Sequence, residues 1–152
     1  MPGREVDDAV MLMARFANGS LGSFEASRFG IGRRNGMGFE MYAERGSLAF
    51  DQEDMNRLRF FDRSDAPSWQ AVRQLLVTGP DHPYSSNFWK PGHIIGYEHT
   101  FIATVADFLR ALAEDEPFHP NFDDALRTQE LIEAVASSAA SGRWQSVESQ
   151  NR

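Results

Sequence analysis

Apolar and polar residues alternate through the first part of the chain, which is the pattern of half-buried β-strands. The first strand starts after Asp8, and one of its sides is formed by Val10, Leu12, Ala14 and Phe16. Asn18-Gly19 follows, the pair that best tolerates the positive φ angles of a tight hairpin. Residues 21–29 then supply the returning strand, with Phe24 and Ala26 directed inward. We therefore expect the first two strands to be antiparallel neighbours.

The middle of the chain continues as short strands and then becomes a long irregular excursion. Alternation predicts strands at residues 39–43, 48–50 and 58–61, with a turn at Arg45-Gly46. Residues 62–97 carry four prolines and three glycines, which excludes a long helix there, although residues 72–77 suit a strand. A loop of that length in a compact domain usually serves a site or covers one. Its aromatic residues therefore mark it as a candidate site, namely Tyr84, Phe88, Trp89 and Tyr97.

The last third of the chain has the spacing of two helices. The first is ended by Pro117, and its apolar stripe contains Phe101, Val105, Phe108, Leu109 and Leu112. Asn121 or Asp123 caps the start of the second helix, and Gly142 provides its left-handed stop. Residues 143–147 are long enough for a closing edge strand. Strands before helices predict an α+β fold: a mostly antiparallel, open-faced sheet with two long C-terminal helices packed on one face.

Length and composition limit the class of protein. The chain has 152 residues, 41% of them apolar, which favours a single domain spanning residues 1–152. A net charge of −7 leaves no basic field for nucleic acid or for an acidic membrane surface. No hydrophobic run has the length of a membrane span or signal peptide, so we expect a soluble, cytoplasmic protein. A nucleotide-binding α/β half alone takes about 120 to 150 residues, which excludes a complete two-domain dehydrogenase.

The motifs that suggest catalysis or cofactor binding are each better explained as local structure. The glycine-rich loop at residues 30–36 imitates a dinucleotide loop, but a strand follows where a helix would have to hold the pyrophosphate. Cysteine is absent and the four histidines have none of the helical spacings of metal ligands, so no metal site is expected. No serine lies in a nucleophile elbow, and neighbouring carboxylates suit helix starts and turns. The sequence therefore offers no general acid and base pair.

The order of five segments is more specific than any one of them. These segments are DAVMLMARFANGSLG (8–22), ERGSLAF (44–50), PGHIIGYEHTF (91–101), PNFDDAL (120–126) and SGRW (141–144). In this order they resemble the C-terminal domain of the Gfo/Idh/MocA oxidoreductases. The resemblance covers nearly the whole chain. It implies NAD(P)-dependent sugar, inositol or other polyol dehydrogenases, in which a Rossmann domain precedes this α+β domain and the open sheet face commonly makes an oligomer contact.

The family's catalytic residues do not carry over to this chain. The glycine fingerprint and the Glu-Lys-Pro motif belong to the missing Rossmann domain, and Trp89-Lys90-Pro91 matches that motif in only two letters. Asp115 and His119 have the spacing of the family's Asp-x-x-x-His pair, but Pro117 between them prevents the helical turn that would align them. We therefore expect no catalytic and no cofactor-binding residue, with NAD or NADP bound only by a full-length enzyme.

The resemblance places the substrate side in the loop from His82 to His99, which is similar to the part that approaches the sugar. An aromatic surface with hydrogen-bonding tips suits a polyol, whose ring carbons stack while its hydroxyls pair. The expected substrate-binding residues are Trp89, Lys90, His93, Tyr97 and His99. The alternative is that Trp89 and Tyr97 only pin a long loop to the sheet.

Three functions follow from these expectations. The first is the substrate-binding and oligomerisation domain of a dehydrogenase acting on a sugar or polyol, not catalytic alone. The second is a non-catalytic interaction domain that self-associates or binds a partner through its open sheet face. The third is a small standalone enzyme acting through the loop that contains His93 and His99.

Overall fold

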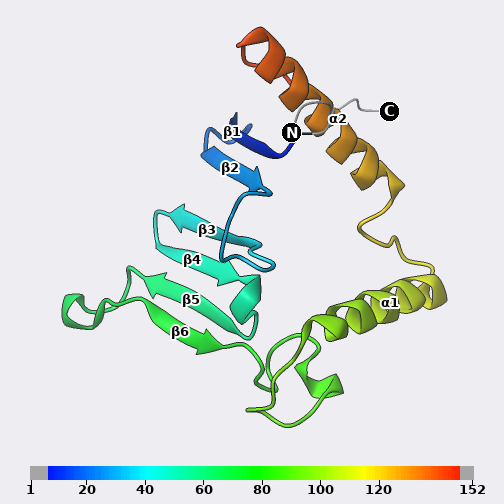
Figure 1. The fold of residues 1–152 in the computed structure, drawn as a ribbon. Helices are drawn as coiled ribbons and strands as arrows, with labels where there is room; N and C mark the ends of the chain where they lie inside the picture. The colour runs from blue at the N-terminus through cyan, green and yellow to red at the C-terminus, as the bar shows by residue number, and fades with distance from the viewer. Residues whose placement is uncertain (1–6, 148–152) are drawn as a thin grey trace. The chain divides into compact units, whose positions relative to one another are not determined.

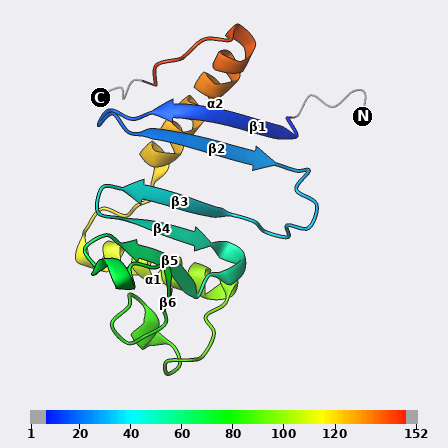
Figure 2. The ribbon, with the colours of Figure 1, turned by 90° about the vertical axis from the view of Figure 1, so that its left-hand side faces the viewer.

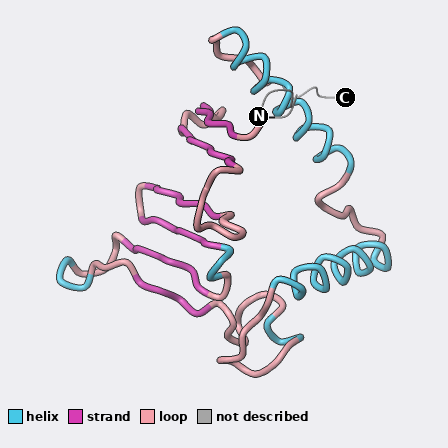
Figure 3. The backbone as a smooth tube through the Cα atoms, viewed as in Figure 1, coloured by secondary structure: helices cyan, strands magenta, loops and turns pink. Residues whose placement is uncertain are grey.

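The computed structural model describes residues 7–147, which divide into two compact units. Figure 1 labels the helices and strands, and Figure 3 colours the backbone by secondary structure. One unit combines residues 7–31 with residues 115–147, and the other is Gly32–Glu114. The main elements are, in chain order, β1 (Ala9–Arg15), β2 (Leu21–Ser27), β3 (Gly38–Ala43), β4 (Gly46–Asp51), β5 (Arg57–Asp62), β6 (Arg73–Leu76), α1 (Tyr97–Glu114) and α2 (Phe122–Ser141). Three short 3₁₀ turns are η1 (Gln52–Asp54), η2 (Pro67–Trp69) and η3 (Ser85–Asn87).

The expected hairpin forms at the start of the first unit. Strands β1 and β2 pair antiparallel, with Leu12 opposite Phe24, so these two side chains share one face as predicted. Gly19 takes a φ of 87°, the left-handed conformation that the turn requires. Asn18 Oδ1 accepts a hydrogen bond of 3.0 Å from the Ser20 amide, which fixes the turn from its own side chain.

Helix α2 of the same unit begins and ends at the predicted residues. Asn121 Oδ1 accepts hydrogen bonds from the amides of Asp123 and Asp124, and the Asp124 carboxylate accepts one from the Asn121 amide. This reciprocal pattern is a capping box. Gly142 follows the last turn with a φ of 65°, and its amide donates to the Ser138 carbonyl.

The closing edge strand predicted at residues 143–147 is wrong. These residues have no ladder partner and adopt no regular structure. Trp144 instead lies 6.0 Å from the Arg15 guanidinium, and the Arg143 carbonyl accepts a hydrogen bond from Ser138 Oγ. A strand needs a neighbour to satisfy its backbone groups, and a segment of sufficient length does not supply one.

The second unit contains an antiparallel meander in the order β3-β4-β5-β6 (Figure 2). In its register Phe39 faces Phe50 and Phe50 faces Leu58, while Leu48 faces Phe60. One face of the sheet is therefore continuously apolar because alternate residues point to the same side. The Arg73 guanidinium lies 5.5 Å from the Phe60 ring at the edge of this face.

The α+β fold class is confirmed, with a correction to the sheet. The strands form two separate antiparallel ladders where one sheet was expected, and β3–β6 form the larger of them. Helix α1 ends three residues before Pro117, and α2 ends one residue before Gly142. The packing of both helices on one face stays a prediction, as does the single domain. No helix within residues 7–147 has both the length and the apolar composition that crossing a bilayer requires.

Candidate functional site

The loop between β6 and α1 is tied to the sheet at its far end by one side chain. Asn56 Nδ2 donates a 2.8 Å hydrogen bond to the Ile95 carbonyl, and Asn56 Oδ1 accepts a 2.9 Å bond from the Ile95 amide. The amide side chain thus pairs with both backbone groups of a residue 39 positions away, in the manner of a strand neighbour. This clasp fixes the chain just before helix α1.

Three of the predicted residues form the exposed tip of this loop. The Trp89 and His93 rings stack with centroids 5.9 Å apart and planes 30° apart, and 78% of Trp89 is exposed. His93 Nδ1 lies 2.8 Å from the Lys90 carbonyl, which can only accept a hydrogen bond. Nδ1 therefore carries the proton, which leaves Nε2 of the neutral His93 ring as an acceptor.

Tyr97 and His99 belong to the first turn of α1 and contact different neighbours from those of the tip. The Tyr97 ring meets Phe101 edge to face, and the His99 ring meets Phe88 in the same way at 4.6 Å. His99 Nδ1 accepts a 3.1 Å hydrogen bond from the Gly96 amide. Because that nitrogen accepts, the Nε2 of a neutral His99 is the donor, the reverse of His93.

Tyr84 holds the other side of the loop to α1. Its backbone is left-handed, with a φ of 64°, which is uncommon for a bulky residue. Its hydroxyl donates a 2.5 Å hydrogen bond to Asp107 Oδ2, and Arg110 pairs with the other carboxylate oxygen at 2.7 Å. The hydrogen bond raises the pKa of Tyr84 and lowers the pKa of Asp107. Tyr84 therefore ties the loop to α1, whereas the alternative concerned Trp89 and Tyr97 and a link to the sheet, and it stays a prediction.

A small recess of about 160 Å³ lies between the clasp and α1. Its wall includes Asn56, Thr78, Phe88, His99 and Ala103. Thr78 is only 6% exposed, and within residues 7–147 its Oγ1 has no hydrogen-bond partner. None of the residues that line the recess is a lysine, arginine, aspartate or glutamate. The recess is therefore lined without carboxylate, ammonium or guanidinium groups, and the Thr78 hydroxyl oxygen lies buried behind its surface.

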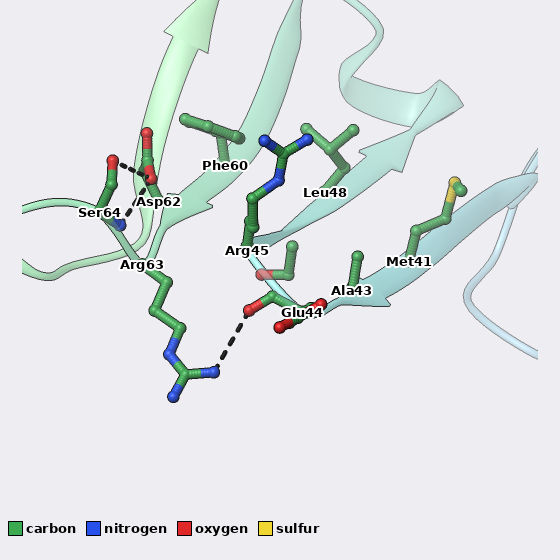
Figure 4. Close-up of a pocket in the computed structure, with 11 residues that line it drawn as sticks. Met41, Ala43, Glu44, Arg45, Leu48, Phe60, Asp62, Arg63 and Ser64 are labelled. Atoms are coloured by element: carbon green, nitrogen blue, oxygen red, sulfur yellow. Dashed lines mark hydrogen bonds between the residues drawn. The ribbon is translucent and has the colours of Figure 1, made fainter.

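The larger hollow lies at the opposite end of the β3–β4 pair, away from the predicted loop. This groove, of about 750 Å³, surrounds the turn at Glu44 and Arg45. Figure 4 shows Arg45 on the same side of the sheet as Leu48 and Phe60. Arg63 points away from it, and its guanidinium donates to the Glu44 carbonyl at 3.3 Å. The groove contains none of the predicted site residues.

The glycine-rich loop at residues 30–36 does not fit a dinucleotide. It leads into strand β3, as predicted, so no helix start is present to receive a pyrophosphate. Glu53 accepts hydrogen bonds from Arg33 Nη1 at 2.9 Å and from the amides of Arg34 and Asn35 at 2.8 and 3.1 Å. These bonds, that of the Arg34 amide foremost, lower the pKa of Glu53 to about 2. The cationic and amide groups that an anion would need are thus paired with a carboxylate.

The remaining candidate groups serve local structure. Asp115 and His119 do not pair, because His119 Nδ1 instead contacts Asp124 Oδ2 at 2.7 Å inside the capping box. The Asn121 amide and the His119 contact lower the pKa of Asp124. Among the residues that the structure describes, no three histidine, aspartate or glutamate side chains gather as metal ligands would.

Sequence reasoning missed Asn56, Thr78 and the role of Tyr84. Asn56 stands in a turn between η1 and β5, where an asparagine has an ordinary local explanation. Thr78 follows β6, and no pattern in the neighbouring residues indicates that its hydroxyl is buried. Tyr84 was noticed only as one aromatic residue of the loop, and the contact to Asp107 spans 23 positions.

Known proteins share this fold and much of this sequence. Residues 1–148 match the model of the Gfo/Idh/MocA oxidoreductase family's C-terminal alpha/beta domain. Levoglucosan dehydrogenase from Pseudarthrobacter phenanthrenivorans is 39% identical over 144 residues, which are 94% of this chain and 37% of that protein.

Solved structures of oxidoreductases also resemble this chain. An oxidoreductase domain protein from Kribbella flavida superposes with a TM-score of 0.92 at 44% identity, over 95% of this chain and 39% of that chain. A levoglucosan dehydrogenase in complex with NADH and L-sorbose gives 0.91 at 39% identity, with the same coverage. The chain thus spans less than two-fifths of the length of these relatives. It belongs to the Gfo/Idh/MocA oxidoreductase family and corresponds to its C-terminal alpha/beta domain.

Proposed function

We propose that this domain binds the sugar or polyol substrate of an NAD-dependent dehydrogenase through the tip formed by Trp89, Lys90 and His93. The observation that carries the proposal is the exposed Trp89–His93 stack, in which His93 Nε2 is left as an acceptor. A sugar offers ring carbons that stack on an aromatic face and hydroxyls that donate to an acceptor. The relative solved with levoglucosan and NADH supports this substrate class and this cofactor.

The chain alone is expected to perform no hydride transfer. Its glycine-rich loop does not fit a pyrophosphate, since Arg33 is paired with Glu53. The nucleotide-binding domain of the full-length protein is therefore the expected partner, and NAD the expected cofactor of the whole. Titration of the 152-residue chain with NADH and NADPH tests this point, and micromolar affinity for either would contradict it.

The substrate role is tested in the full-length oxidoreductase that carries this domain. Trp89→Ala should raise the KM for a sugar or polyol about three- to tenfold, the worth of one aromatic contact. The KM for NAD⁺ should stay unchanged. Trp69→Ala is the matched control, because both tryptophans are 78% exposed and only Trp89 lies in the loop between β6 and α1. Equal sugar KM values for both variants and the parent would refute the proposal.

His93 provides the second arm of that test. His93→Ala removes the acceptor and should weaken sugar binding about fivefold, the usual value of one hydrogen bond. His93→Gln restores a hydrogen-bonding side chain and should recover part of the loss. Recovery with Gln separates the acceptor role from mere support of Trp89.

A second function, association through the open sheet face, is favoured by the exposure of that face. Phe39 and Met41 on β3 are 48% and 59% exposed on the apolar side of the sheet. An apolar surface of this kind is usually covered by a second copy or by another domain. Light scattering should find an oligomer that Met41→Glu dissociates, and a strictly monomeric parent protein would exclude self-association.

A further inference from the structure

The substrate tip proposed above has two ends, and a different contact fixes each of them. The Asn56 clasp holds the far end at Ile95, two residues after His93. The near end is Phe88, the residue directly before Trp89. Because the Trp89 and His93 rings stack across the tip, their contact depends on the positions of both ends. The near end therefore needs an attachment of its own.

Two backbone hydrogen bonds connect the near end to Tyr84. The Asn87 amide donates to the Tyr84 carbonyl at 2.9 Å. The Phe88 amide donates to the Ser85 carbonyl at 3.2 Å. These bonds belong to the 3₁₀ turn η3, which follows Tyr84 directly and ends beside Phe88. The position of Trp89 therefore follows from that of Tyr84, with one tight turn between them.

Tyr84 is attached to helix α1 by its hydroxyl. That hydroxyl donates a 2.5 Å hydrogen bond to Asp107 Oδ2, while the Arg110 guanidinium donates to the other carboxylate oxygen at 2.7 Å. Hydrogen bonds to an ionised acceptor are stronger than those between neutral groups. The left-handed backbone of Tyr84, with a φ of 64°, is a conformation that a bulky residue keeps only where its surroundings hold it. The bond to Asp107 provides this restraint.

The turn η3 contacts α1 at a second point, which gives it an orientation as well as a position. The Phe88 and His99 rings meet edge to face with centroids 4.6 Å apart. His99 and Asp107 are eight residues apart on α1, which is about 12 Å along a helix at 1.5 Å per residue. Two attachments to one rigid helix prevent rotation about either of them. Without the attachment at Asp107, η3 can rotate about Phe88, and Trp89 moves with it.

We infer that Tyr84 is a positioning residue for sugar binding, whose hydrogen bond to Asp107 holds Trp89 where a sugar can stack on it. This inference rests on the proposed function, because it concerns the same tip. A ligand that binds one arrangement of a loop loses apparent affinity in proportion to the fraction of molecules that have this arrangement. Loss of the bond should therefore raise the sugar KM and leave kcat unchanged, since Tyr84 contacts no reacting atom in this scheme.

The test uses the full-length oxidoreductase that carries this domain. Tyr84→Phe removes only the hydroxyl and should raise the KM for a sugar or polyol about fivefold, while kcat and the KM for NAD⁺ keep their parent values. Tyr42→Phe is the matched control, because the Tyr42 hydroxyl also donates to a carboxylate, that of Glu40 at 2.6 Å on strand β3. A merely structural role of Tyr84 would lower the fraction of folded enzyme, and with it the apparent kcat, without changing the sugar KM.

Substitutions at Asp107 provide a conservative rescue and decide the case if Tyr84→Phe does not fold. Asp107→Asn keeps an oxygen that accepts from the Tyr84 hydroxyl, so its sugar KM should stay near that of the parent. Asp107→Ala should reproduce the rise expected for Tyr84→Phe, and the double variant should show no further rise because both substitutions remove the same bond. A parent-like sugar KM in Asp107→Ala would overturn the inference.

Hydrogen exchange in the 152-residue chain adds a readout that needs no sugar. Tyr84→Phe should speed exchange of the Asn87 and Phe88 amides about fivefold, because both amides donate within η3. Exchange at the parent rate overturns the inference. If Trp89→Ala raises the sugar KM and Tyr84→Phe does not, the inference fails and the proposed function stands. If Trp89→Ala keeps the parent sugar KM, the proposed function fails and the inference fails with it.

Discussion

The Asn56 clasp allows a quantitative prediction because a single side chain makes both bonds. Asn56→Ala removes the hydrogen bonds to the Ile95 amide and carbonyl, at 2.9 and 2.8 Å in a partly buried position. At about 1 kcal/mol for each bond, the segment before α1 should lose about 2 kcal/mol of local stability. The Ile95 amide is itself a donor in the clasp, so its hydrogen exchange measures this loss directly. We expect exchange about 30-fold faster at that amide.

A charged variant adds a pH-dependent test of the same geometry. In Asn56→Asp one carboxylate oxygen still accepts from the Ile95 amide, but the other faces the Ile95 carbonyl without a proton. This repulsion raises the pKa of the introduced carboxyl above its unfolded value of about 3.9. An acid with a raised pKa binds its proton more tightly in the folded chain. The variant should therefore regain stability as the pH falls through that raised pKa, with the full gain below about 3.9.

Asn18→Ala is the control for both variants. It also removes two side-chain hydrogen bonds, but both join Asn18 to Ser20 within an exposed turn. It should leave exchange at Ile95 unchanged. If Asn56→Ala exchanges at the parent rate, the clasp does not hold the loop.

Three further predictions concern the two ends of helix α2 and the hydrogen bonds that Glu53 accepts from the glycine-rich loop. Asn121→Ala should lower the free energy of unfolding by about 1 kcal/mol in denaturant titrations, whereas Asn121→Asp should retain the cap of α2 because it keeps the acceptor. Gly142→Ala should lower the free energy of unfolding by about 1 to 2 kcal/mol in the same assay. A φ of 65° is unfavourable for a residue with a Cβ, even though no neighbouring atom would contact that Cβ. Glu53 has a pKa of about 2, below its usual 4.5, so its stabilisation should be complete above about 4.5 and lost as the pH falls through about 2. Glu53→Gln should remove this dependence of stability on pH. An NMR titration giving an ordinary pKa for Glu53 would contradict the hydrogen bonds that it accepts from residues 33–35.

The elements that could be predicted are those whose causes lie within a few neighbouring residues. Asn18-Gly19 closes its hairpin with its own side chain and backbone, and the Asn121 cap and Gly142 stop act within one helical turn. Alternation in β3–β5 also sufficed, because each strand pairs with its immediate successor along the chain. The strand at residues 143–147 was predicted from the length of the segment alone, and without a partner strand these residues form no ladder.

The candidate site was predictable only as a region. Its position followed from the prolines, glycines and aromatic residues of the loop, and from the resemblance to a family. The contacts that shape it join residues 39 and 23 positions apart, from Asn56 to Ile95 and from Tyr84 to Asp107. No local propensity encodes such pairs, because an asparagine or tyrosine has many possible partners and the fold selects one.

The two histidines show why residue identity alone does not define a binding surface. His93 and His99 each place Nδ1 against a backbone group three residues earlier, the Lys90 carbonyl in one case and the Gly96 amide in the other. A carbonyl requires a proton on Nδ1 and an amide forbids one, so the Nε2 atoms of the neutral rings have opposite polarity. His93 can then accept from a sugar hydroxyl, while His99 can only donate. The orientation of one peptide group at each position therefore decides which ligand atoms the loop can receive, and this orientation is a property of the folded chain.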